Sequence, residues 1–93
     1  MVVWTVELDE ELFVELESWT LDRQFELDAI QRRLARGGPE GMGVTRHELE
    51  GVPAWKDLGG VVSLRVPVDL PSGFRVLTLE VQPGFTIIVV SLE

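Results

Sequence analysis

Three consecutive β-strands near the end of the sequence are the feature that most limits its fold. Residues 61–66, 74–81 and 85–91 are rich in Val, Ile, Leu, Phe and Thr, and turn-forming residues occupy positions 69–73 and 82–84 between them. Apolar and β-branched runs separated by Pro and Gly are typical of β-hairpins. The sequence therefore predicts an antiparallel β-meander, in which the last two strands pair through the turn at 82–84.

Side-chain alternation predicts which face of each strand is buried. In the first strand, one face carries Val62, Leu64, Val66 and Val68, and the other carries Ser63, Arg65 and Pro67. The same alternation places Arg75 of the second strand on the face of Leu77 and Leu79. The third strand is apolar throughout, which is typical of a central strand. Pro67 lacks an N–H, so we expect it at a strand end or on an edge strand.

The first half of the sequence predicts one strand and two helices. Residues 2–8 have apolar side chains at every second position, as in a short strand. Asp9 is a favourable N-cap for a first helix, and Thr20 is one for a second helix from residue 21 to about residue 36. Helical spacing along the first helix is shown by Leu12, Leu16 and Trp19. We therefore expect an α+β fold, in which an N-terminal strand and a two-helix hairpin pack on an antiparallel β-meander.

The second helix carries apolar residues on two opposite sides. Leu27, Ile30 and Leu34 cluster on one side of a 3.6-residue helical wheel and are expected to face the sheet. The opposite side carries Leu21, Phe25 and Ala29. We expect the first helix to cover this second stripe, and the alternatives are another chain or a partner peptide. If the first helix covers it only partly, glutamates of that helix border the stripe, which then suits a partner helix with basic flanks.

Acidic side chains are concentrated in the first third of the chain. The net charge is −8, and residues 1–30 contain nine acidic side chains and a single basic one, Arg23. The other residues contain seven acidic and seven basic groups, which cancel. Because binding to a phosphate backbone needs clustered Lys and Arg, the acidic segment is excluded as a nucleic-acid surface. A solvated helix face is its simplest interpretation.

Length and composition limit the organisation and the location of the protein. The 93 residues are enough for one small domain, which we expect to span residues 1–93. The absence of cysteine excludes disulfides, thiolate catalysis and cysteine-bound zinc. No apolar run approaches the roughly 20 residues of a membrane-spanning helix, and no basic segment precedes an apolar one at the N-terminus. We therefore expect a cytoplasmic protein without a membrane partner.

The sequence contains no pattern typical of a catalytic triad, a metal site or a cofactor site. His47 is the single histidine, and no Gly-x-Ser-x-Gly motif occurs. The acidic pairs of the first helix lack a histidine or a calcium-loop pattern. We expect neither a metal nor a cofactor.

Basic side chains are the remaining candidates for chemistry. Arg65 and Arg75 stand on neighbouring strands of the predicted meander. Further cations in the segment before them are Arg46 and Lys56. Cations that converge on one face of a sheet can bind phosphate or stabilise a phosphoryl-transfer transition state. The alternative is that they form ion pairs with Glu80, Asp69 or Glu48. Alternation leaves open whether Arg65 and Arg75 share a face.

The order of the predicted elements and several short segments resemble one protein family. These segments are Val6-Glu7-Leu8-Asp9-Glu10, Leu49-Glu50-Gly51-Val52-Pro53, Ser63-Leu64-Arg65, Ser72-Gly73-Phe74-Arg75-Val76-Leu77 and Ile87-Ile88-Val89-Val90. Together with the order strand, helix, helix and three-stranded meander, they resemble the RelE/ParE superfamily of bacterial toxin–antitoxin toxins, as a divergent member. The resemblance implies an antitoxin protein as partner, and the ribosome with its mRNA, or DNA gyrase, as target.

The resemblance also implies roles for individual residues. Toxins of the RelE branch cleave mRNA on the ribosome with lysines of the first meander strand and an arginine of the second. Arg75 matches that arginine, and Arg65 is its neighbour; Val61 and Ser63 occupy the lysine positions. Since a phosphoryl transition state would keep only one or two stabilising cations, we expect little or no ribosome-dependent mRNA cleavage. The sequence leaves enzymatic activity open.

The resulting functional hypothesis is a RelE/ParE-like toxin component of a bacterial toxin–antitoxin system. One alternative is a non-catalytic protein–protein interaction module that uses its acidic helix face to bind a basic partner. Another is a small oligomeric structural protein, in which Leu21, Phe25 and Ala29 are buried between copies. A neighbouring gene for a small antitoxin-like protein would favour the first hypothesis.

Overall fold

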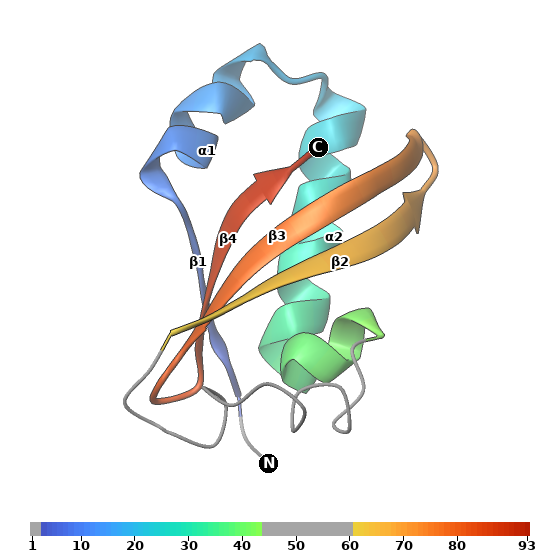
Figure 1. Cartoon of the computed structure of the whole chain (residues 1–93). Helices are drawn as coiled ribbons and strands as arrows, with labels where there is room; N and C mark the ends of the chain where they lie inside the picture. Colours follow the sequence, from blue (N-terminus) through green and yellow to red (C-terminus); the bar gives the residue numbers. More distant parts are fainter. Residues whose placement is uncertain (1–2, 44–60) are drawn as a thin grey trace.

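The protein is an α+β domain in which one long helix packs on a four-stranded sheet (Figure 1). A computed structural model describes residues 3–43 and 61–93. The elements in chain order are β1 (Thr5–Leu8), α1 (Glu10–Glu15), the 3-10 helix η1 (Leu16–Ser18), α2 (Leu21–Gly37), the 3-10 helix η2 (Gly38–Met42), β2 (Val62–Leu70), β3 (Gly73–Gln82) and β4 (Thr86–Leu92). Arg46, His47, Glu48, Lys56 and the segment 49–53 lie outside the described residues, so the predictions made for them stay predictions.

The sheet confirms the predicted meander and corrects the prediction for the first strand. Its order is β1-β4-β3-β2, and β3 pairs antiparallel with both β2 and β4. β1, however, is part of the sheet and pairs with β4 in parallel, with Val6 opposite Ile87 and Leu8 opposite Val89. The sheet is therefore mixed and not antiparallel. No tight turn joins β1 to β4, so no hairpin forces them to be antiparallel, and β1 covers the second edge of an apolar central strand.

Pro67 lies within β2, which is an edge strand, as predicted. Val76 and Glu93 exchange two backbone hydrogen bonds, of 3.1 and 2.9 Å, between β3 and the end of β4. The backbone N–H and C=O groups of successive residues point to opposite sides of a strand. Since those of Val76 point to β4, those of Arg75 point to β2 and meet the backbone groups of its partner Val68. The backbone nitrogen of Pro67 then points to the free edge, where its missing N–H removes no bond of the sheet and removes one donor for strand addition.

Capping side chains define the beginnings of both α-helices. Asp9 Oδ2 accepts a hydrogen bond of 3.2 Å from the N–H of Glu11, and Thr20 Oγ1 accepts one of 3.3 Å from the N–H of Arg23. Both predicted N-caps are confirmed. Near the predicted end of the second helix, α2 stops at Gly37, and Gly38 follows with φ of 61°.

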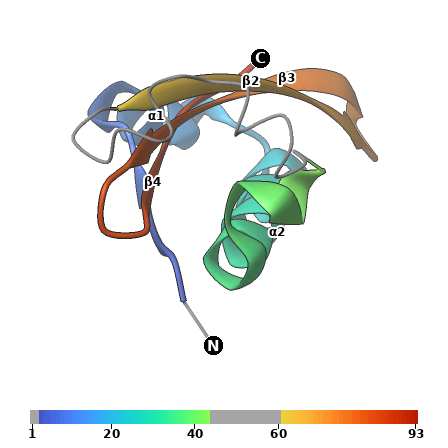
Figure 2. The same cartoon turned by 60° about the horizontal axis from the view of Figure 1, so that its bottom comes forward.

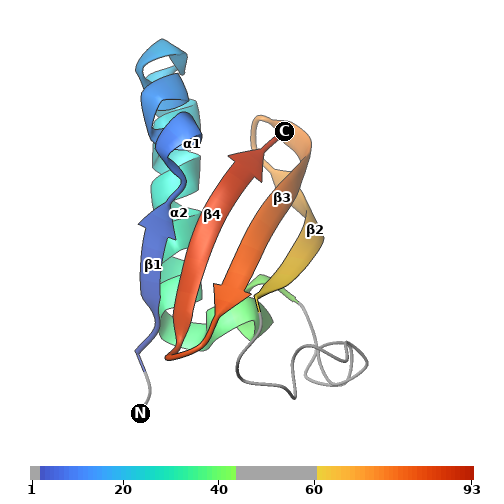
Figure 3. The same ribbon diagram turned by 60° about the vertical axis from the view of Figure 1, so that its left-hand side comes forward.

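The first helix is shorter than the sequence predicts. α1 ends at Glu15, and the chain tightens into η1 before Trp19. Backbone carbonyls in this segment accept hydrogen bonds from side chains in place of helical N–H groups. The Ser18 hydroxyl donates to the carbonyl of Glu15 (2.8 Å), and Gln24 Nε2 donates to the carbonyls of Leu16 and Trp19 (both 3.1 Å). The predicted two-helix hairpin is therefore a single turn and a half of α-helix near the start of α2 (Figures 1 and 3).

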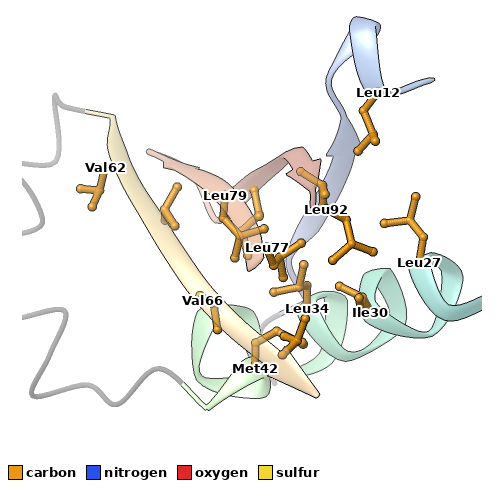
Figure 4. Packing of buried hydrophobic residues seen from close by; sticks show 14 of the residues in the cluster. Leu12, Leu27, Ile30, Leu34, Met42, Val62, Val66, Leu77, Leu79 and Leu92 are labelled. Atoms are coloured by element: carbon orange, nitrogen blue, oxygen red, sulfur yellow. The ribbon is translucent and has the colours of Figure 1, made fainter. Parts of the chain in front are cut away.

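The core lies between α2 and the concave face of the sheet, which arches over this helix (Figure 2). Leu27, Ile30 and Leu34 are buried and point to the sheet, as predicted (Figure 4). Their sheet-side partners include Val62, Val66, Val68, Leu77, Leu79, Val81, Ile87, Val89 and Leu92. Each fully buried side chain of this size stabilises the fold by about 1.5–3 kcal/mol.

A β-bulge in β4 explains why both Val89 and Leu92 are buried. Leu79 pairs with Val89, whereas Thr78 pairs with Ser91, so Val90 is an extra residue on β4. Without a bulge, residues three positions apart point to opposite faces of a strand. The extra residue shifts the alternation and returns Leu92 to the core face.

Candidate functional site

The two candidate catalytic arginines lie on opposite faces of the sheet. Arg75 is paired with Val68 and lies on the face that packs on α2, where the alternation predicted it. Arg65 is paired with Thr78 and lies exposed on the outer face. The sheet therefore separates the two guanidinium groups, and they do not converge on one phosphate.

Arg75 is half-buried and connects the β2–β3 turn to the helix. Its Nε donates a hydrogen bond of 3.3 Å to Ser72 Oγ, and the Ser72 hydroxyl donates one of 2.8 Å to Glu26 Oε2 on α2. Ser72 thus bridges an arginine of β3 and a glutamate of α2. These contacts indicate that Arg75 helps to hold the β2–β3 turn against α2.

Arg65 has polar but no cationic neighbours on the outer face among the described residues. The cross-strand register places Thr78 and Ser91 in its row, and Ser63 and Glu80 in the next row. Val61 and Ser63, which stand where the resemblance implies lysines, are both exposed. One arginine beside hydroxyl groups and a carboxylate gives little stabilisation to a dianionic phosphoryl transition state.

The solvent face of α2 is the most prominent described surface feature. Leu21 and Phe25 are 68% and 67% exposed, and Ala29 is also exposed. The next turns on this side carry Arg32, Arg33 and Arg36. We call these six residues the α2 strip, with an apolar end (Leu21, Phe25, Ala29) and a basic end (Arg32, Arg33, Arg36).

The expectation that the first helix covers the apolar stripe is wrong. α1 has six residues, and its buried side chain, Leu12, joins the core near the sheet instead of packing along α2 (Figure 4). Its remaining apolar residues, Phe13 and Val14, are themselves exposed. A helix of this length spans about 9 Å at 1.5 Å per residue, too short to run along the apolar end of the strip.

The basic end of the strip borders a hollow on the surface of α2. A shallow open hollow of about 510 Å³ is lined by Phe25, Asp28, Ala29, Arg32, Arg33 and Arg36. Within it, Arg32 Nη2 and Asp28 Oδ2 form an ion pair of 2.9 Å, which is the single ion pair among the described residues. The hollow therefore combines an aromatic ring with a surplus of arginine side chains. A partner that binds in this hollow therefore needs acidic groups to meet the basic end of the strip.

Sequence reasoning missed the cluster that holds the start of α2 against the end of β4. The Arg23 guanidinium lies over the Trp19 ring, 3.9 Å from its centroid, and Nη2 of Arg23 donates a hydrogen bond of 3.4 Å to the carbonyl of Leu92. The signal available in the sequence was the spacing of four residues between Trp19 and Arg23 across the start of the second helix, which allows a cation–π contact. These contacts serve the fold, because they tie the helix junction to the sheet.

The described residues contain no group of three or more His, Asp or Glu side chains arranged to hold a metal ion. Over the same ranges, 3–43 and 61–93, no helix has the length and apolar character needed to cross a membrane. Comparison of the chain with protein-family models, with curated proteins and with solved structures found no match.

Proposed function

We propose that this protein is a RelE/ParE-like toxin-type domain that acts by binding other proteins and not by cutting RNA. The observation that carries the proposal is the α2 strip, in which Leu21 and Phe25 remain about two-thirds exposed on a helix of 17 residues. Large apolar side chains that gather on one exposed face, beside charged ones, are typical of protein-binding surfaces. The partner is an antitoxin protein, which lays an apolar segment on Leu21, Phe25 and Ala29.

The order of elements supports the toxin-type architecture. Over the described residues the chain runs strand, helix, helix and three-stranded meander, which is the order on which the family resemblance rests. Residues of the resembling segments occupy defined places in this order, such as Asp9 at the start of α1 and Arg75 after the β2–β3 turn. The architecture is thus compatible with the resemblance at the level of topology.

The separation of the arginines favours binding over cleavage. A nuclease that works by electrostatic stabilisation needs several cations around one phosphate. Here Arg65 and Arg75 are on different faces, and Arg75 is engaged through Ser72 with Glu26. A target such as gyrase or a ribosomal protein needs only a contact surface.

Co-expression tests this proposal. The chain is induced alone and together with any small protein encoded beside its gene, and growth, complex formation and transcript integrity are followed. We expect growth arrest with the chain alone, rescue by the partner, co-purification of the two proteins, and no new cuts by primer extension on a reporter transcript. Codon-positioned cuts that disappear in Arg75→Ala would show that the protein is a nuclease.

A pair of phenylalanine variants tests where the partner binds. Phe25 and Phe74 are 67% and 70% exposed, on α2 and on the outer side of the β2–β3 hairpin. We expect Phe25→Ser to weaken the complex at least tenfold in calorimetric titration, and Phe74→Ser to leave it unchanged. The reverse result would place the partner on the sheet. Binding without growth arrest would instead indicate the non-catalytic interaction module.

A further inference from the structure

The α2 strip is complementary to itself when two copies of it run in opposite directions. Its first half carries Leu21 and Phe25 with two acidic neighbours, Asp22 and Asp28, and its second half carries three arginines. We propose that, in the absence of another partner, the strip is covered by the strip of a second copy of this chain, with the two α2 helices antiparallel around a twofold axis near Ala29. This inference does not depend on the toxin-type function, because it needs only the free protein.

The distribution of charge along the molecule favours the antiparallel arrangement. α1 and the start of α2 form one end of the domain (Figures 1 and 3). That end contains the exposed acidic side chains Glu10, Glu11, Glu15, Glu17 and Asp22. The other end of α2 carries Arg32, Arg33 and Arg36. An antiparallel copy brings each acidic end to a basic end, whereas a parallel copy would place like charges together.

Individual residues fit the same arrangement. On the exposed side of α2, Phe25 lies before the midpoint and the arginines lie after it, so an antiparallel copy places an arginine of one chain over the Phe25 ring of the other. Such cation–π contacts are favourable when the cation lies within about 6 Å of the ring centroid. Ala29 falls near the centre of the contact, where a small side chain lets two helix axes approach closely.

The expected dimer is weak and easily exchanged. One pair of helices buries less surface than the roughly 1,200–2,000 Å² of a stable standard interface. The net charge of −8 on each chain also opposes association. We expect a dissociation constant in the micromolar range or weaker. A partner protein that binds the same strip would therefore displace the second copy.

Sedimentation velocity of the full chain tests the dimer over a wide concentration range. We expect the wild type to shift from monomer to dimer in the upper micromolar range, and Phe25→Ser and Arg36→Glu each to weaken the dimer at least tenfold. Arg65→Glu makes the same charge change on the outer face of the sheet and should leave the dimer unchanged. A wild type that stays monomeric, or a dimer unaffected by Phe25→Ser and Arg36→Glu, would overturn the proposal.

Cysteine cross-linking tests the orientation, since the chain has no native cysteine. In an antiparallel pair centred near residue 29, two copies of residue 29 are neighbours. Two copies of residue 21 are about 24 Å apart, which is twice eight residues at 1.5 Å each. Under mild oxidation we expect rapid disulfide formation between two copies of Ala29→Cys. Leu21→Cys should cross-link only at the slow rate of random collision, which is measured with Ser63→Cys on the outer face of the sheet as the control. Equal rates for Ala29→Cys and Leu21→Cys would exclude the antiparallel arrangement.

Discussion

Gly38 is the position where a single added methyl group should disturb the fold most specifically. It follows α2 with φ of 61° and ψ of −153°, a backbone conformation that only glycine adopts easily. A Cβ at this position would lie 2.4 Å from Cε2 of the Trp4 indole. Trp4 cannot yield freely, because its backbone N–H donates to the carbonyl of Ala35 (2.9 Å) and its ring contacts that of Phe85 edge to face, at 5.2 Å between centroids.

The magnitude for Gly38→Ala follows from these two effects. Holding alanine in this conformation costs about 1–3 kcal/mol. Displacement of the Trp4 indole removes an aromatic pair that is worth about 0.5–1.5 kcal/mol beyond its buried area. Together they predict a loss of about 2–4 kcal/mol in the free energy of unfolding. For a domain of this size that lowers the melting temperature by about 8 °C or more.

Urea and thermal unfolding followed by circular dichroism and tryptophan fluorescence measure this loss. Gly37→Ala is the matched control, because no atom lies within 4 Å of its added Cβ and its φ of −116° is allowed for alanine. We expect Gly37→Ala to be neutral or stabilising by up to about 1 kcal/mol. If Gly38→Ala is as stable as Gly37→Ala, the close approach of Trp4 to the end of α2 is refuted.

Further expected outcomes concern the core, a cap and the sheet edge. Leu34→Ala removes a fully buried side chain and should lower the free energy of unfolding by about 2–5 kcal/mol, whereas Phe25→Ala should change it by less than about 0.5 kcal/mol; equal losses in urea titrations would mean that Phe25 belongs to the core. Thr20→Ala should cost about 1 kcal/mol by the same assay, and an unchanged midpoint would contradict the cap. Pro67→Thr restores an outward N–H on the edge of β2 and should promote aggregation measured by light scattering; unchanged scattering on prolonged incubation would contradict its protective role.

The elements that the sequence predicted best are those specified by local chemistry. Asp9 and Thr20 cap helices through their own neighbours, and the spacing of Leu27, Ile30 and Leu34 specifies a buried face without reference to any other element. The β3–β4 hairpin was predictable for the same reason, since its turn and its apolar runs are adjacent in sequence.

Features that depend on distant contacts were not predictable. The parallel pairing of β1 with β4 joins residues about eighty positions apart, and no local pattern specifies its direction. The early end of α1 depends on Gln24, whose amide reaches back to two carbonyls of the preceding turn. Because α1 is short, Phe25 stays exposed although its spacing is that of a packed face.

The candidate site shows the same division. Alternation within each strand predicted the faces of Arg65 and Arg75 separately. Their relation to one another could not be derived, because β3 has apolar residues on both faces and either could have joined the core. In the structure the face of Leu77 is buried. Arg75 therefore lies on the core face of the sheet, and Arg65 lies on the outer face.

The bulge at Val90 determines which of the last residues of β4 face the core. If β4 paired regularly through Val90, with no extra residue, Ser91 would turn inward and Leu92 outward. The carbonyl of Leu92, which accepts the Arg23 hydrogen bond, would turn with it, so the stacked Trp19 and Arg23 would lose their anchor on the sheet. Deleting Val90 would have no such effect, because Ser91 would stay opposite Thr78 and Leu92 opposite Leu77. A slip of one residue in strand pairing, with no change of sequence, would therefore detach the helix junction from the strand it rests on.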